Sequence, residues 1–158
     1  MESPIGNVLI VVSDVGVRRI EFLTDSSSTS HLLLEHNANA TGIQHEFLRH
    51  TSDELHQYFL GKRKAFSVPI DVAGTKFQTQ AWNALSQIPY GATWSYSQQA
   101  HHIGRPRAVR AIGTANSKNP VAIVVPCHRV IGADGSLTGY AGGLDKKMWL
   151  LRHESQNS

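Results

Sequence analysis

The chain has 158 residues, of which 41% are hydrophobic and 17% are charged, and its formal net charge at pH 7 is +3. This length is enough for one good core or for two small lobes packed together. No apolar run is long enough to cross a bilayer, and the first residues lack the charged-then-apolar pattern of a secretion signal. We therefore expect a soluble protein with no membrane partner, whose mildly basic charge permits nucleic-acid binding without requiring it.

The cysteine content excludes further classes of site. Cys127 is the one cysteine of the chain, which excludes an intramolecular disulfide and a multi-cysteine zinc site. A lone thiol fits a reducing compartment, so we expect a cytoplasmic protein. The nine histidines are scattered, and the adjacent His101 and His102 would point to different helix faces. We expect surface histidines and no bound metal.

Residues 1–71 are predicted to form a small α/β lobe in which nothing suggests chemistry. Segments rich in apolar residues are strand-like, and apolar residues at helical spacing predict a helix that Gly61 ends. In chain order we expect strands at 7–13 and 17–23 joined by a hairpin turn, a polar loop at 25–29, a helix within 31–35, a helix at 45–60 and a strand at 64–70.

Residues 72–74 are a plausible linker to a second lobe, predicted to span residues 75–158. Thr75 can cap a helix that runs to about Ile88, with apolar and aromatic side chains along one side. An aromatic stripe at this spacing is far more often core than cofactor site, so we expect Trp82 to pack in the interior. The run of residues 89–91, which contains proline and glycine, ends this helix.

Two short helices are predicted next, at residues 95–102 and 107–116. Gly104 stops the first, and Pro106 suits the first turn of the second, so together they form a helix-turn-helix pattern. Arg107 and Arg110 supply charge on the second helix, and its alanines would allow close approach to a phosphate backbone. An ordinary helical hairpin with a solvated basic face remains the alternative.

Cys127 follows a short apolar run at residues 119–124, which predicts a buried strand or extended segment that ends at the thiol. Pro126 fixes its own φ and favours extended geometry before it, so the chain enters the cysteine stiffly. A thiol is a nucleophile only as a thiolate, and the imidazole of His128 is the obvious group to generate it. The alternative is an inert buried cysteine beside a surface histidine.

Four short motifs occur in a fixed order: NP at residues 119–120, PCHRV at 126–130, GYAGG at 139–143 and WLLRHE at 149–154. With them, the chain resembles the O6-alkylguanine-DNA alkyltransferase family from about Phe77 to Glu154. The resemblance implies a two-lobe α+β (α/β) fold. A small ribonuclease-H-like sheet-and-helix lobe would precede a mainly helical lobe with a winged-helix-like helix-turn-helix.

The resemblance also implies a reaction. Cys127 would attack the alkyl carbon on O6 of a guanine that has been flipped out of duplex DNA. His128 would take the thiol proton through a water, and Glu154 would orient that imidazole. Tyr96 matches the tyrosine that binds guanine N3 and donates a proton, and Asn119 matches a structural asparagine that orients the cysteine segment.

DNA contacts follow from the same resemblance. Arg110 matches an arginine that fills the gap left by the extruded nucleotide, and Tyr140 can form a wall of the pocket for the base. Further DNA-binding residues are expected at Ser97, Arg105 and Ala133. Ala141 stands where some members carry serine, which leaves the range of alkyl groups open.

The product would be a thioether at Cys127, which no second cysteine can resolve, so one molecule would repair one lesion without a cofactor. The expected partner is double-stranded DNA bearing O6-alkylguanine, with O4-alkylthymine left open, and the expected state is a monomer that could bind DNA cooperatively. Two alternatives remain: a cysteine hydrolase, and a non-catalytic module of the same fold that binds alkylated DNA.

Overall fold

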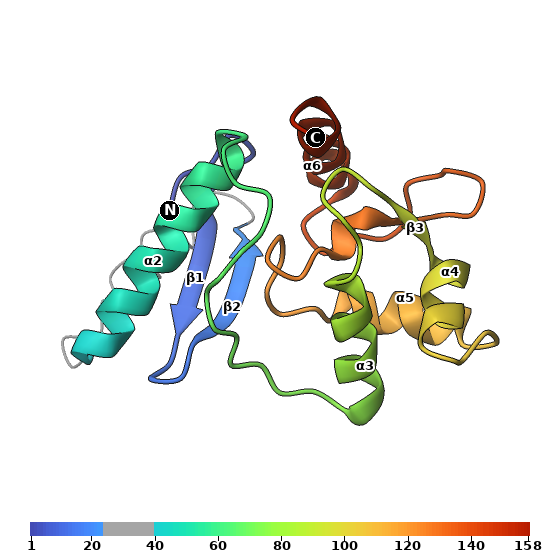
Figure 1. Ribbon diagram of the computed structural model, residues 1–158, viewed down its shortest axis with the longest axis horizontal. Coiled ribbons are helices and arrows are strands. Elements are labelled where there is room, and N and C mark those ends of the chain that lie inside the picture. Colours follow the sequence, from blue (N-terminus) through green and yellow to red (C-terminus); the bar gives the residue numbers. More distant parts are fainter. Residues whose placement is uncertain (24–39) are drawn as a thin grey trace. The chain divides into compact units, whose positions relative to one another are not determined.

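The computed structural model describes residues 1–23 and 40–158, and these form two compact units, residues 1–72 and residues 73–158. Figure 1 shows strands and one long helix in the first unit and several shorter helices in the second. The loop predicted at 25–29 and the helix predicted within 31–35 lie outside the described residues. Within the described ranges, no helix has both the length and the apolar character of a membrane span.

The first unit is built on a hairpin. Strands β1 (Val8–Val12) and β2 (Val17–Phe22) pair antiparallel, with Ile10 opposite Ile20, which confirms the two predicted strands. Helix α2 (Gly42–Phe59) packs against β1, and its buried residues include Leu55 and Tyr58. A hairpin alone is marginal in water, so its apolar face needs this helix.

Helix α2 begins three residues before its predicted start. Thr41 accepts a hydrogen bond from the Gln44 amide at 3.3 Å, and the Gln44 side chain accepts one from the Thr41 amide at 3.3 Å. This reciprocal capping box satisfies two amide groups that the first helical turn leaves without partners. The position of the cap, which precedes the apolar pattern, therefore sets the helix start.

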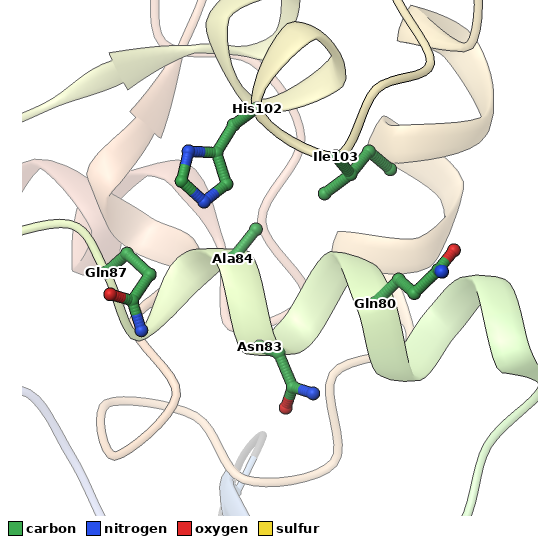
Figure 2. A pocket seen from close by; sticks show the side chains of 6 residues that line it. All are labelled: Gln80, Asn83, Ala84, Gln87, His102 and Ile103. Atoms are coloured by element: carbon green, nitrogen blue, oxygen red, sulfur yellow. The ribbon is translucent and has the colours of Figure 1, made fainter.

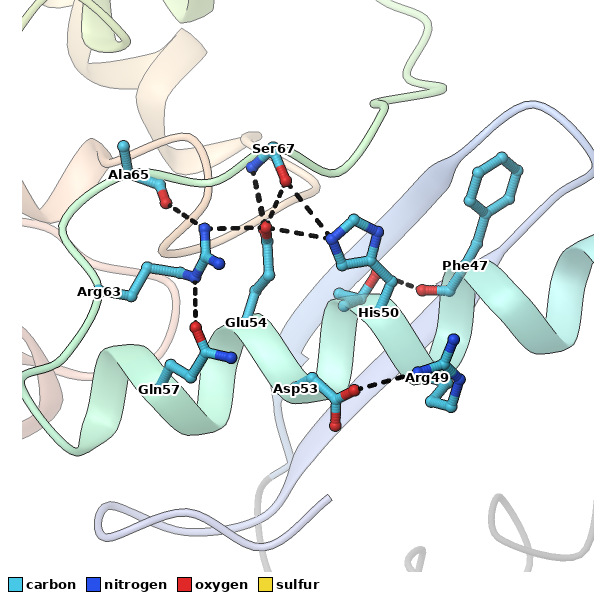
Figure 3. A network of polar contacts seen from close by, with 10 residues as sticks. Phe47, Arg49, His50, Asp53, Glu54, Gln57, Arg63, Ala65 and Ser67 are labelled. Carbon is cyan, nitrogen blue, oxygen red and sulfur yellow. Dashed lines mark hydrogen bonds and ion pairs between the residues drawn. The ribbon is translucent and has the colours of Figure 1, made fainter.

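The strand predicted at residues 64–70 is wrong. Only a single bridge joins this segment to β2, where the Val17 amide donates to the Pro69 carbonyl at 2.8 Å. Upstream, Glu54 of α2 captures the segment by accepting from the Ser67 amide at 2.9 Å and from Arg63 at 2.9 Å (Figure 3). The Ser67 amide and the Arg63 side chain therefore donate to the buried Glu54 carboxylate, and the Ser67 amide does not pair with a neighbouring strand.

Gly16 allows the bridged segment to approach the hairpin turn. A Cβ atom at this position would lie 2.5 Å from the Pro69 carbonyl oxygen, closer than real contacts permit. The glycine is therefore required for the close approach of two backbones.

The second unit begins with helix α3 (Lys76–Leu85), which confirms the predicted cap at Thr75. Trp82 is buried as predicted, and its ring N–H donates to the Ala115 carbonyl at 2.9 Å. The helix ends at Leu85, three residues before the predicted Ile88, because the Gln87 and Ile88 amides bond three residues back and tighten the last turn.

Helices α4 (Tyr96–His102) and α5 (Val109–Ser117) form the predicted helix-turn-helix, and the turn contains Gly104 at φ +69°. The second helix starts two residues later than predicted. The Ala108 amide donates to the Arg105 carbonyl at 2.9 Å and closes a separate turn, and no side chain among the described residues caps the helix at Ala108.

A buried amide pair locks the two helices together. Gln99 of α4 donates to the Asn116 side chain at 3.0 Å, and Asn116 of α5 donates back at 2.8 Å. Gln99 also donates to the Ala81 carbonyl at 3.0 Å, and Ala81 belongs to a buried core cluster with Ala100, Ile112 and Ala115. The polar pair fixes the register of α4 against α5, because any slip would leave buried amides unsatisfied.

The rest of the unit carries the motif residues. A short 3₁₀ helix η1 (Cys127–Arg129) leads into β4 (Val130–Ile131), which pairs in parallel with β3 (Trp94–Ser95), and the last helix is α6 (Leu144–Gln156). Because β3 directly precedes α4, this short pairing brings the start of α4 beside the cysteine segment.

The strand or extended segment predicted at residues 119–124 is wrong. The Val125 amide donates to the Val121 carbonyl at 3.0 Å, so the chain turns back on itself. Buried Ile123 adopts φ +73°, a left-handed conformation that a β-branched residue rarely takes. Backbone strain therefore lies four residues before Cys127.

Candidate active site around Cys127

The half-buried Cys127 thiol is held by one amide side chain. Asn119 donates from Nδ2 to Cys127 Sγ at 3.2 Å and to the Val125 carbonyl at 2.7 Å, while its Oδ1 accepts from the Val121 amide at 3.1 Å. The Asn119 side chain thus stabilises the turn before the cysteine through two hydrogen bonds and directs an N–H donor at the sulfur. A donor in this position favours a thiolate over a thiol.

A buried ionic cluster lies next to the cysteine. Glu154 of α6 accepts from His128 Nε2 at 2.8 Å and receives two bonds from Arg129, from Nε at 2.8 Å and from Nη2 at 3.0 Å. The Gly91 amide donates to the same carboxylate at 3.1 Å, and Arg129 also donates to the Ile88 carbonyl at 2.7 Å. Each of these contacts gives the carboxylate a donor.

These contacts set the protonation of the pair. Burial alone would raise the pKa of Glu154, but the hydrogen bonds from His128 and Arg129 and the charge of Arg129 outweigh it and hold that pKa far below its ordinary value. Burial lowers the pKa of His128, and the hydrogen bond to Glu154 only partly opposes this. The cluster is therefore an anionic carboxylate, a guanidinium and a neutral imidazole.

The neutral imidazole has a defined tautomer. Since Nε2 faces a carboxylate that can only accept, Nε2 carries the proton and Nδ1 carries the lone pair. Within the described part of the chain, the buried Nδ1 atom has no hydrogen-bond partner. His128 therefore presents a buried base whose other nitrogen is oriented by Glu154.

The thiol itself is not acidic in this environment. Burial raises the pKa of Cys127, and the Asn119 hydrogen bond and the positive charge of Lys147 offset part of that rise. A group that removes the proton is thus needed, which is the property that His128 has.

Sequence reasoning missed Lys147. The side chain is fully buried, and its ammonium group donates to the Val130 carbonyl at 2.6 Å and to the Thr138 carbonyl at 2.9 Å. A signal was present: Lys147, Leu150 and Glu154 follow the i, i+3, i+7 spacing of one helix face, and all three are buried on α6. A lysine on a buried face is rare unless it is bound.

Two tyrosines flank the same region. The Tyr96 hydroxyl donates to the Thr138 carbonyl at 3.0 Å, and its ring lies 5.7 Å from Lys147 Nζ. The Tyr140 hydroxyl is buried with no hydrogen-bond partner among the described residues. Burial raises the pKa of Tyr140 well above its ordinary value, and the nearby charge of Cys127 adds to the rise. Tyr140 is therefore neutral.

The predicted DNA-binding residues outside this centre lie at the surface of the second unit. Arg110 is exposed on α5, and Arg105 is exposed in the preceding turn, with its guanidinium 6.0 Å from the Phe77 ring centre. The Ser97 carbonyl accepts from His101, and Ala133 is exposed in a tight turn after β4. The structure therefore separates an exposed basic helix pair from a buried chemical centre.

A separate surface pocket holds none of the predicted site residues. It lies between α3 and the end of α4, as Figure 2 shows. Its lining is Gln80, Asn83, Ala84, Gln87, His102 and Ile103. Elsewhere in residues 1–23 and 40–158, no three histidine, cysteine or acidic side chains gather in a way that could hold a metal ion.

Comparison with known proteins covers both units. The family model of the 6-O-methylguanine DNA methyltransferase ribonuclease-like domain matches residues 1–72, and that of the DNA binding domain matches residues 76–156. The methylated-DNA--protein-cysteine methyltransferase of Methanosarcina acetivorans is 45% identical over 153 residues, which cover 97% of this chain and 94% of that protein. The inducible one of Bacillus subtilis is 58% identical over 105 residues, which cover 66% and 59%.

Solved structures give the same result. The crystal structure of the Mycobacterium tuberculosis O6-methylguanine methyltransferase superposes with a TM-score of 0.84 at 40% identity, covering 100% of this chain and 92% of that one. The crystal structure of the same organism's OGT in complex with DNA gives a TM-score of 0.85 at 40% identity, with the same coverage.

Proposed function

The chain belongs to the 6-O-methylguanine DNA methyltransferase family, and from that premise we propose that Cys127 takes the alkyl group from O6 of guanine in duplex DNA. The chain is a DNA-repair protein that acts by alkyl transfer, and DNA is its partner. One observation carries the assignment to Cys127: its thiol has a hydrogen-bond donor in Asn119 and a buried neutral base in the adjacent His128.

In the proposed step, the thiol proton leaves Cys127 for Nδ1 of His128 through a bridging water, and the sulfur electron pair forms a bond to the alkyl carbon. The bond between that carbon and O6 breaks, and its electron pair stays on guanine. Guanine takes up one proton, which we assign to the Tyr96 hydroxyl. Solvent then returns a proton to Tyr96 and accepts one from His128, so the net change is the exchange of one alkyl group for one proton.

Glu154 and Asn119 act as positioning residues in this proposal. Glu154 holds the Nε2–H tautomer of His128 and stabilises the imidazolium that forms when Nδ1 is protonated. Arg129 keeps Glu154 ionised throughout, because the pair is bidentate and buried. Asn119 stabilises the thiolate through the bond from Nδ2.

Access to the alkyl carbon requires extrusion of the nucleotide, because a stacked base hides O6 inside the duplex. We assign Arg110, exposed on α5, to the gap left in the stack, and Arg105, Ser97 and Ala133 to the surrounding DNA contacts. Tyr140 would form the wall of the pocket for the extruded base. The position of Arg110 on the helix-turn-helix supports this assignment.

The reaction should stop after one turnover. A thioether is a poor leaving group, and the sequence contains no second cysteine that could release it. We further propose that the protein acts as a monomer in the cytoplasm, where a reducing environment keeps the single thiol available.

Mass spectrometry tests the proposal directly. Mixing the protein with duplex DNA that carries O6-methylguanine should add one methyl group, confined to the Cys127 peptide, and Cys127→Ala should gain nothing. A methyl group on any other residue would contradict the assignment. Binding without a mass change would support a non-catalytic module, and turnover of acyl esters would support a cysteine hydrolase.

A further inference from the structure

Lys147 is a buried cation for which the proposed reaction has no role so far. Its Nζ atom has three donor hydrogens and three partners: the Val130 carbonyl at 2.6 Å, the Thr138 carbonyl at 2.9 Å and the face of the Tyr96 ring at 5.7 Å. Carbonyl oxygens and an aromatic face all attract positive charge, so this cage suits an ammonium group.

The Thr138 carbonyl links Lys147 to a proposed proton donor. This one oxygen accepts from Lys147 Nζ at 2.9 Å and from the Tyr96 hydroxyl at 3.0 Å. Thr138 lies in the irregular segment between β4 and α6, which has no helix or strand of its own to hold it. The lysine therefore ties this segment to α6 and fixes the acceptor that orients Tyr96.

The charge of Lys147 is also not cancelled by an acid. Glu154, on the same face of α6, is matched by the bidentate Arg129, and His128 is neutral. Tyr140 is neutral as well, while Lys147 makes no ion pair with a carboxylate in the part of the chain that the structure describes. Lys147 bonds the Val130 carbonyl, directly after the short helix that begins with Cys127, so a Cys127 thiolate would supply a negative charge in the same region.

We propose that Lys147 is a positioning residue for alkyl transfer, which holds the Tyr96 hydroxyl through the Thr138 carbonyl and balances the negative charge of the Cys127 thiolate. The inference deepens the proposed function and rests on it for the role of Tyr96. The effect of the Lys147 charge on the reactivity of the Cys127 thiol does not require DNA. This effect can therefore be tested separately from the role of Lys147 in holding Tyr96. Burial raises the pKa of Cys127 and lowers the pKa of Lys147, and in each case the charge of the other residue opposes that change.

The first experiment measures the rate at which iodoacetamide alkylates Cys127 across a pH range, in the full-length protein without DNA. Lys147→Met removes the charge at similar length, Lys147→Arg keeps it, and Lys146→Met is the matched control on the same helix. We expect Lys147→Met to react roughly threefold or more slowly at neutral pH, with its profile moved to higher pH. Lys147→Arg should recover most of the rate, and Lys146→Met should follow the wild type.

The second experiment measures single-turnover methyl transfer from O6-methylguanine duplex DNA. Lys147→Met and Tyr96→Phe should each slow transfer, and the double variant should be little slower than the worse single variant, because both act on one proton donor. Fully additive losses would contradict the link through Thr138. If wild-type protein transfers no methyl group, the proposed function fails while the iodoacetamide result still stands.

If Lys147→Met and the wild type show the same rates of Cys127 alkylation across the pH range, the proposal that the Lys147 charge balances the thiolate is overturned. Should Lys147→Met fail to fold, Lys147→Gln, which can still donate to both carbonyls but carries no charge, replaces it. Equal profiles for Lys147→Gln and Lys147→Arg would then overturn the proposal, and a slower Lys147→Gln would support it.

Discussion

At the scale of single residues, the candidate site depends on donors and charges placed around one sulfur atom. Asn119 is the clearest case, because one amide group bonds the Cys127 sulfur, the Val125 carbonyl and the Val121 amide. No other residue described near the thiol bridges the turn and the sulfur at once. Its amide nitrogen should matter more than its size.

The change Asn119→Asp tests this. The substitution keeps the shape and the bond from the Val121 amide but replaces the donor with a negative charge, which disfavours a thiolate. Burial already raises the pKa of Cys127, so wild-type methyl transfer should rise with increasing pH, and the Asn119→Asp rise should come at higher pH. We expect transfer at neutral pH to fall about tenfold or more.

Asn119→Ser is the matched control, since a hydroxyl can still donate and carries no charge. Single-turnover rates against pH for the three proteins decide the matter. An unshifted pH profile in Asn119→Asp would mean that the amide acts only through the fold of the turn.

At the scale of elements, three helices begin with the same device. Thr41, Thr75 and Ser95 each accept from an amide three residues ahead, and a glutamine at that position bonds back to the cap. Helix α5 has no such cap and begins later than the apolar pattern suggests. Its position depends instead on the glycine turn and the amide pair with α4.

The glycine turn between α4 and α5 gives a prediction. Gly104 has φ +69° and open space where a Cβ would lie, so Gly104→Ala should cost about 1 kcal/mol from backbone conformation alone. Gly113 lies within α5, where a Cβ would meet the Tyr96 ring at an ordinary 3.9 Å. Gly113→Ala should therefore stabilise the protein by about 0.5–1 kcal/mol.

Urea unfolding of the two variants beside the wild type measures both changes. Opposite signs are expected from the same substitution in one motif. If Gly104→Ala proved neutral, the turn would have to adopt another conformation in solution.

At the scale of the whole molecule, chemistry and support divide between the two units. Every residue assigned to the reaction lies within residues 73–158, whereas residues 1–72 contain a buried network around Glu54. This carboxylate accepts from Ser67 and Arg63, and His50 Nε2 lies 3.2 Å from it (Figure 3). Loss of the network should change stability but not the reaction.

Glu54→Gln should destabilise the protein by about 1–2 kcal/mol, because charged hydrogen bonds become neutral ones. Burial alone would raise the pKa of Glu54, but the Ser67 hydrogen bonds and the Arg63 and His50 charges lower it below its ordinary value of 4.5. Its contribution is therefore full above pH 4.5 and is lost as pH falls through the lower folded-state value. The stability gap to wild type should narrow accordingly in acid.

Asp53→Asn is the matched control, since the pair with Arg49 is exposed and its loss should fall within about 0.5 kcal/mol. Thermal unfolding at several pH values measures the gap. Methyl transfer by folded Glu54→Gln should equal that of the wild type, and a slower rate would show that the first unit takes part in the chemistry.

Much of this protein is determined by its sequence alone. The order of NP, PCHRV, GYAGG and WLLRHE indicates the family, and caps such as Thr75 and the apolar, β-branched residues of β1 and β2 predict local structure. These features can be predicted from the sequence because each depends on residues that are close to one another in the chain. A cap needs only the next turn, and the strand propensity of a segment is set by its own residues.

Tertiary structure decided the rest. Apolar residues at 64–70 and 119–124 have strand composition, but Glu54 captures the first segment and a turn through Ile123 replaces the second. The role of Lys147 could not be predicted from its neighbours, because its acceptors lie 9 and 17 residues away in the chain. Hydrogen bonds between distant segments outweigh local propensity, since a buried polar group without a partner costs more than a propensity gains.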